Sequence, residues 1–152
     1  MIKTGGNLQK CIREKGKEFQ DFELHLIMEY ANENLTFWMA CERFLEEPTF
    51  EFASEIIEGY IVPNCENPIN VPNKMLKNLT ADLISLPPKT NGVKKAMRHV
   101  FDVLKGGYER FSEKNTMKSV RRNRRSRVLS AISLISTGLR PCLRTPSTGK
   151  QK

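Results

Sequence analysis

The residues best suited to recognise another molecule form a polar triplet, Asn32-Glu33-Asn34, which shortly precedes Trp38, the only tryptophan. The residues that follow the triplet are apolar on almost every side of the expected helix, so this helix should be central to the fold. Polar side chains beside a buried helix need hydrogen-bonding partners or a function. Two interpretations fit. The amide and carboxylate groups bind a partner, or Asn32 is an N-cap with Glu33 in the first helical turn.

No motif for bond-making chemistry accompanies the triplet. The sequence lacks G-x-x-x-x-G-K and G-x-S-x-G, and no nucleophile is paired with a base. His25 and His99 pair with no other ligand-type residues, and no two cysteines form C-x-x-C. The cysteines are Cys11, Cys41, Cys65 and Cys142. We expect reduced thiols, no metal or other cofactor, and no enzyme with chemistry of its own.

The composition predicts one soluble domain with a basic tail. Of 152 residues, 39% are hydrophobic and 28% are charged, and no apolar run is long enough to cross a membrane. The first residues lack the apolar stretch of a secretory signal, so we expect a cytoplasmic protein. Ten of the 25 basic residues and none of the 17 acidic ones follow residue 117. The preceding part is therefore nearly neutral, and the overall charge does not argue for nucleic-acid binding.

Helical periodicity runs through the chain, and no stretch alternates as a strand does. The expected helices cover residues 19–30, 33–46, 52–61, 73–83, 93–104 and 108–117. Thr49 and Asn73 are the expected N-caps of two of them. Gly106-Gly107 is expected to interrupt the chain between the last two. The sequence therefore predicts an all-α fold of about six helices.

Four segments resemble the regulator of G-protein signalling (RGS) domain. Residues 29–44, EYANENLTFWMACERF, resemble its signature of an acidic residue, an aromatic residue and then Glu-Asn-Leu-x-Phe-Trp-x-x-Cys-Glu-x-Phe. IIEGYI (residues 56–61), NPINVP (67–72) and VFDVLKGGYERF (100–111) follow in the order of the family. The resemblance covers residues 19–117 and implies an all-α, RGS-like multi-helix bundle with shortened N-terminal helices.

RGS domains accelerate GTP hydrolysis by Gα subunits, so the resemblance implies a GTPase activator that terminates signalling. Gα already holds the catalytic arginine and glutamine, and the RGS domain binds its switch regions in their transition-state arrangement. The implied Gα-binding residues are Glu33, Asn34, Asn70, Val103, Leu104, Gly106, Gly107 and Arg110. The first two would face the switches, Asn70 would lie nearest the Gα glutamine, and Arg110 would orient neighbouring polar groups. Val103 or Leu104 would supply apolar contact.

Two further departures from the family pattern accompany the shortened N-terminal helices. Gly106-Gly107 stands where the family has Asp-Ser, so the aspartate that grips a switch threonine has no counterpart. Loss of such a charged hydrogen bond costs about 1.5–3 kcal/mol. Ala31 stands where relatives often have serine. The alternative function is therefore an RGS-like Gα-binding or scaffold module with weak or no GTPase-activating effect.

Three parts are expected along the chain: residues 1–18 as a polar segment or partial helix, 19–117 as the RGS-like domain, and 118–152 as a basic tail. The tail is either disordered or lies on a membrane at the inner face of the plasma membrane. Its arginines would attract anionic lipid: Arg121, Arg122, Arg124, Arg125 and Arg127. An apolar face would follow: Val128, Leu129, Ile132, Ile135 and Leu139. Nuclear import or RNA binding is less favoured, and acylation of Cys142 is a weak possibility.

Overall fold

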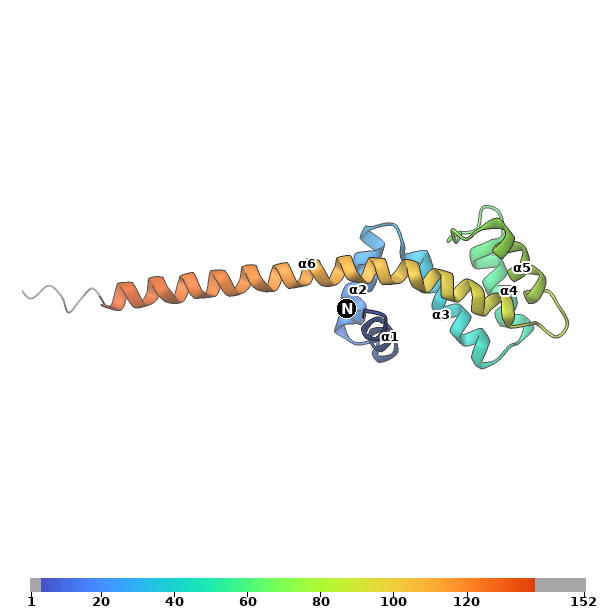
Figure 1. Cartoon of the computed structure of the whole chain (residues 1–152), viewed down its shortest axis with the longest axis horizontal. Helices are drawn as coiled ribbons and strands as arrows, with labels where there is room; N and C mark the ends of the chain where they lie inside the picture. The colour runs from blue at the N-terminus through green and yellow to red at the C-terminus, as the bar shows by residue number, and fades with distance from the viewer. Residues whose placement is uncertain (1–3, 139–152) are drawn as a thin grey trace, which may run out of the picture. The chain divides into compact units, whose positions relative to one another are not determined.

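The computed structural model describes the backbone of residues 4–138, and this part is helical with no strand. The predicted all-α fold is confirmed. Seven helical segments follow in order (Figure 1): α1 Thr4–Glu14, α2 Lys17–Met28, α3 Asn32–Glu46, α4 Phe50–Ile56, the π-helix η1 Ile57–Ile61, α5 Asn73–Leu83 and α6 Asn91–Gly138. The chain divides into two units, Met1–Phe111 and Ser112–Lys152. Each unit is considered on its own below.

In the first unit, consecutive helices pack against one another around one hydrophobic core. The core includes aromatic residues from several elements. The Trp38 ring lies 6.0 Å from that of Phe101, which joins α3 to α6. Phe22 of α2 meets Tyr108 of α6 edge-on, with 5.3 Å between ring centroids. The predicted central position of this helix is confirmed, because α3 buries side chains on most of its circumference, including Trp38.

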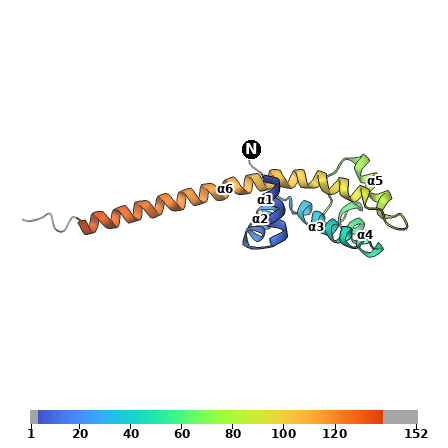
Figure 2. The same cartoon turned by 60° about the horizontal axis from the view of Figure 1, so that its bottom comes forward.

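The N-terminal segment forms a complete helix, α1, which packs beside α2 (Figure 2). Leu8, Cys11 and Ile12 recur at helical spacing and are each at most 3% exposed. This apolar stripe is short, and polar residues and glycines surround it in the sequence. Burial of a few side chains at i, i+3 and i+4 is sufficient to dock a helix of this length on a larger core.

The helix starts of α4 and α5 differ in how they are capped. Thr49 is the predicted N-cap of α4, and its Oγ1 accepts a hydrogen bond from the Phe52 amide at 3.3 Å, which confirms the prediction. The same prediction for Asn73 is wrong. Asn73 is already the first helical residue, and Pro72 precedes it with φ −55° and no side-chain cap. The fixed φ of proline replaces the cap in directing the chain into α5.

Helix α6 continues through Gly106 and Gly107, so the predicted interruption there is wrong. Two helical glycines cost about 1 kcal/mol each relative to alanine. That cost is offset by core packing on both sides of the pair, since Leu104, Tyr108 and Phe111 are all at most 5% exposed. A Cβ at position 107 would lie 3.2 Å from Leu26 Cδ2, so the missing side chain also lets α6 approach α2 closely.

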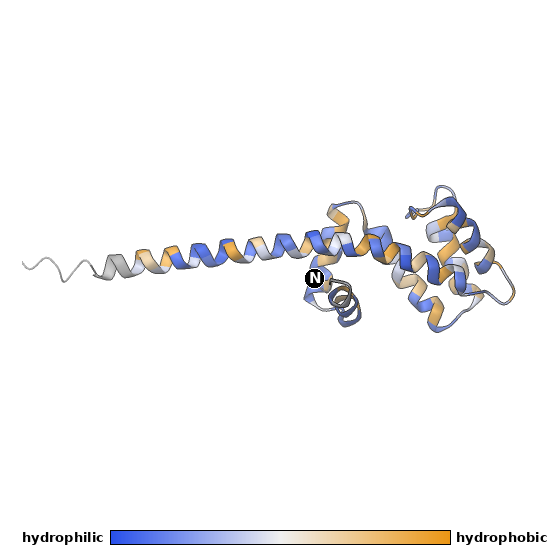
Figure 3. Ribbon diagram, viewed as in Figure 1, coloured by the Kyte–Doolittle hydropathy of each residue, from blue (hydrophilic) through white to orange (hydrophobic). Residues whose placement is uncertain are grey.

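The second unit is described as helix to Gly138, and its side chains are described to Ser133. All side chains from residue 113 to residue 133 are exposed. Figure 3 shows that this part of α6 is mostly hydrophilic and has isolated apolar turns. The side chain of Ile135, together with Leu139 and Cys142, lies outside the described residues.

Candidate functional site

A tight turn joins α2 to α3 and places an aromatic side chain in solvent. The Tyr30 amide donates to the Ile27 carbonyl at 3.1 Å, and the Ala31 amide donates to the Leu26 carbonyl at 2.9 Å. This pair of bonds is the Schellman helix end, whose left-handed position usually holds glycine. Here that position is Tyr30, with φ 54°, and its side chain is 94% exposed. A strained backbone that exposes an aromatic ring is typical of a binding surface.

The polar triplet forms the first turn of α3, with Ala31 at the N-cap position and no side-chain cap. The Asn34 Nδ2 donates to Glu33 Oε1 at 3.1 Å. Glu33 is half-buried, whereas Asn34 is only 7% exposed, so the Asn34 side chain does not have the accessible position that contact with the switches would require. Helical spacing explains the difference, because Asn34 lies one turn before Phe37 and Trp38 on the face that enters the core.

Asn32 is the first helical residue, so its interpretation as an N-cap is also wrong. Its Oδ1 is buried and has no hydrogen-bond partner among the described residues. The Thr36 Oγ1 donates to the carbonyls of Asn32 and Glu33 at 3.4 and 3.2 Å, and these bonds leave the first amides of α3 without a side-chain cap. The negative charge of Glu33 in the first turn is favourable beside the positive end of the helix dipole.

Asn70 is exposed near the end of a loop, residues 62–72, and both of its neighbours in the chain are held in place. The Ile69 amide donates to the Tyr60 carbonyl at 3.2 Å, and the Val71 side chain is 8% exposed. The Tyr60 ring packs edge-on against Phe37, with 5.4 Å between centroids. Through Tyr60, the loop is therefore attached to α3 one helical turn after the polar triplet.

A third polar group connects the end of α2 to α6. Arg110 Nη2 lies 2.9 Å and Nε 3.3 Å from Glu29 Oε2, and His25 Nε2 lies 3.3 Å from the other carboxylate oxygen. The hydrogen bond to Glu29 raises the pKa of Arg110. The ion pair is partly exposed, so it adds little stability, about 0–1 kcal/mol, and its main effect is to fix geometry. Sequence reasoning missed Glu29 as a site residue, although it is the first residue of the quoted signature.

The remaining predicted residues occupy one turn of α6 and differ in exposure. Val103 is 49% exposed, whereas Leu104 is 1% exposed and belongs to the core. Of the two residues offered for apolar contact, only Val103 therefore has an accessible side chain. Gly107 is buried and Gly106 is half-buried. At Gly106 an added Cβ would meet nothing closer than Arg110 Nη1 at 3.6 Å, so this position has room for a side chain.

The arrangement offers hydrogen-bonding and apolar groups for contact with a partner. The described residues include no cluster of three or more potential metal ligands. Burial raises the pKa of the Cys11 thiol to about 11 and also raises the pKa of the Cys41 thiol, so both are protonated and unreactive at neutral pH. In the part of the chain that the structure describes, no helix has an apolar stretch that could cross a membrane.

Comparison with known proteins decides the family. The family model of the regulator of G protein signaling domain matches residues 8–119 of this chain. The chain belongs to the RGS domain family. Domains of this family regulate G-protein signalling and generally bind Gα subunits, and the match begins inside α1. A search of curated proteins found no match to this chain.

Proposed function

We propose that this RGS domain is a GTPase-activating protein for heterotrimeric Gα subunits and acts on their GTP-bound form. The observation that carries the proposal is the exposed Asn70, which is held between an anchored Ile69 and a buried Val71 beside α3. A polar side chain on a fixed backbone can stabilise one arrangement of a mobile partner with little entropy loss of its own.

The proposed mechanism is differential binding. Gα supplies its own arginine and water-orienting glutamine, and hydrolysis is slow while the switch regions that carry this machinery are mobile. Asn70 would hydrogen-bond beside the glutamine, and Glu33 would contact the neighbouring switch. Tyr30 and Val103 would add apolar contact, with Arg110 held in place by Glu29. Because these contacts are stronger in the transition-state arrangement than in the ground state, they lower the barrier.

A second candidate is an RGS module that binds Gα with weak or no acceleration. Gly106 favours it, because a carboxylate is absent where the family aspartate grips a switch threonine. The burial of Asn34 also favours it, since only Glu33 of that pair is left to reach a partner without rearrangement. The two functions share a binding surface and differ in whether the affinity rises in the transition state.

Single-turnover GTP hydrolysis tests the proposal. Gα subunits of the different subclasses are loaded with GTP, and phosphate release is followed with and without this protein. We expect GTP hydrolysis by at least one subclass to be accelerated, and the acceleration should saturate as the concentration of this protein rises. Binding to GTP-loaded Gα without acceleration would favour the second candidate. If neither binding nor acceleration is detected with any subclass, up to high micromolar protein, both functions are ruled out.

We also propose that the second unit brings the cytoplasmic domain to the inner face of the plasma membrane. Its exposed helical arginines are Arg121, Arg122, Arg124, Arg125 and Arg127. Basic residues near an anionic leaflet each contribute about 1 kcal/mol to attraction. Sedimentation with phosphatidylserine vesicles should retain the wild-type chain and release a variant with all five changed to glutamine. Equal retention of both would contradict the membrane role.

A further inference from the structure

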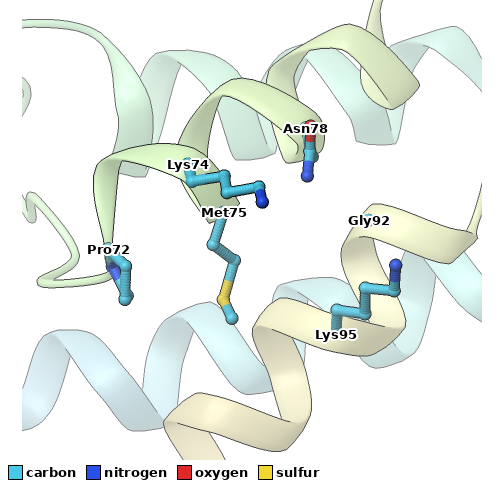
Figure 4. Close-up of a pocket in the computed structure, with 6 residues that line it drawn as sticks. All are labelled: Pro72, Lys74, Met75, Asn78, Gly92 and Lys95. Carbon is cyan, nitrogen blue, oxygen red and sulfur yellow. The ribbon is translucent and has the colours of Figure 1, made fainter.

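We propose that a cavity between α5 and the first turns of α6 is a binding site for a small anionic ligand, a phosphate monoester with an apolar substituent. The cavity has a volume of about 230 Å³. Its lining residues are Pro72, Lys74, Met75, Asn78, Gly92 and Lys95. Figure 4 shows Lys74 and Lys95 on opposite sides of the space and on different helices, with the Met75 side chain on the same side as Lys74.

One end of the cavity is fixed by the close approach of the two helices. A Cβ at Gly92 would lie 2.9 Å from the Leu79 Cα and 2.9 Å from Asp82 Oδ2. The Gly92 amide donates to that same carboxylate oxygen at 2.6 Å. The glycine therefore allows the contact, and the hydrogen bond holds it. The cavity is consequently a feature of the helix packing.

The charges that line the cavity are not neutralised by the protein. Among the described residues, neither Lys74 nor Lys95 has a carboxylate within ion-pair distance. The nearest acidic residue to the cavity in sequence, Asp82, already accepts from the Gly92 amide. Lys74 also lies in the first turn of α5, where the helix dipole disfavours a cation. Both side chains are exposed, so their ammonium groups are accessible to an anion that enters between the two helices.

The surrounding sequence strengthens the positive potential. Residues 67–101 contain six basic residues and one acidic residue, whereas residues 14–66 contain three basic and 13 acidic ones. The near neutrality of the whole domain conceals this separation. A cavity with low-dielectric walls in the basic part concentrates the field and raises the local concentration of anions.

The size and lining of the cavity define the ligand. Ammonium groups bind phosphate through charge-assisted hydrogen bonds. Met75 and Pro72 provide an apolar wall for a ring or a short alkyl chain. Most sites for drug-sized ligands occupy about 300–1,000 Å³, so a smaller molecule or the headgroup region of a lipid is expected. Both sources present the same phosphate monoester chemistry, and they are separated by experiment.

The test is a titration of the full chain with phenyl phosphate by calorimetry. Inorganic phosphate is titrated in parallel, and phosphatidylcholine vesicles with and without phosphatidic acid test the lipid source. The variant is Lys74→Gln with Lys95→Gln. The matched control is Lys77→Gln with Lys94→Gln, which removes the same charge from the same two helices outside the cavity. Circular dichroism checks that both variants keep the helical fold.

We expect phenyl phosphate to bind the wild-type chain more tightly than inorganic phosphate, with at least tenfold weaker binding by the cavity variant and little change in the control. Vesicle binding that needs phosphatidic acid and the cavity lysines would identify a lipid headgroup as the source. Equal losses in the two variants would show non-specific charge and overturn the proposal. The proposal would also be overturned if the wild-type chain bound neither millimolar phenyl phosphate nor vesicles that contain phosphatidic acid. None of these outcomes depends on the effect of the domain on Gα.

Discussion

The loop that carries Asn70 and the turn of α6 that contains Gly106 and Gly107 both hold predicted Gα-binding residues but present different chemistry. The loop has an exposed amide whose two neighbours are anchored to η1 and to the core. The α6 turn has a regular helical backbone with one buried and one half-buried glycine, and it has no side-chain carboxylate at position 106. The loop therefore presents an amide that can hydrogen-bond to a partner, whereas the α6 turn presents no side chain at position 106. A binding surface can lose chemistry at one position without losing its architecture.

The largest effect is expected from Asn70→Ala. Removal of one partner of a hydrogen bond at a desolvated interface leaves the other group unpaired and costs about 1–3 kcal/mol, which corresponds to roughly a 5- to 100-fold loss. The initial rate of stimulated GTP hydrolysis by Gα, measured well below saturation, should fall by this factor. Asn67→Ala is the matched control, since Asn67 is another exposed asparagine of the same loop. Equal losses in both variants would show that the loop acts only through its general conformation.

Gly106→Asp is expected to supply the carboxylate that the α6 turn lacks. The position has room, and the introduced carboxylate would lie one helical turn before Arg110, an arrangement that favours an ion pair. If the missing carboxylate limits recognition, Gα affinity measured by biolayer interferometry should rise by about tenfold. The charge-neutral control is Gly106→Asn. An unchanged or weaker affinity for the aspartate variant would mean that this turn does not face Gα.

The two glycines should respond oppositely to a methyl group. Gly106→Ala relieves the cost of a helical glycine and meets no close atom, so stability should rise by about 0.5–1 kcal/mol. Gly107→Ala places its Cβ 3.2 Å from Leu26 Cδ2, and overpacking offsets the helical gain. Urea denaturation should therefore rank Gly107→Ala below Gly106→Ala by about 1 kcal/mol or more. The reverse order would contradict the packing of α6 on α2.

The smallest effect is expected in the rate of thiol modification, measured for one cysteine in the loop and one in the helical core. Cys65 is half-buried in the Asn70 loop, whereas Cys11 is buried and its pKa is raised to about 11. Because the thiolate is the nucleophile, Cys11 should react with iodoacetamide slowly at pH 8 and faster as the pH rises toward its pKa. In a Cys142→Ser background, mass spectrometry of peptides should find Cys65 modified first. Modification of Cys11 first at pH 8 would contradict the docking of α1.

The sequence was sufficient for the fold class, for the inward face of α3 and for the Thr49 cap, because each depends on local periodicity or on one short hydrogen bond. The burial of Asn34, the continuity of α6 through two glycines and the Glu29–Arg110 pair depend on which helix packs against which. Local patterns do not contain that information. Gly106-Gly107 would interrupt an isolated helix, and only the packing of Leu104, Tyr108 and Phe111 against the core outweighs that tendency.

The most direct test of the central claim compares the affinity of this domain for one Gα subunit in three states: GDP-bound, bound to a non-hydrolysable GTP analogue, and bound to GDP with aluminium fluoride as a mimic of the transition state. Differential binding requires the tightest complex with the aluminium fluoride form, and Asn70→Ala should reduce that preference more than Asn67→Ala does. Equal affinity for the three states would show that the domain does not distinguish the transition state, and acceleration of GTP hydrolysis by the proposed mechanism would be contradicted.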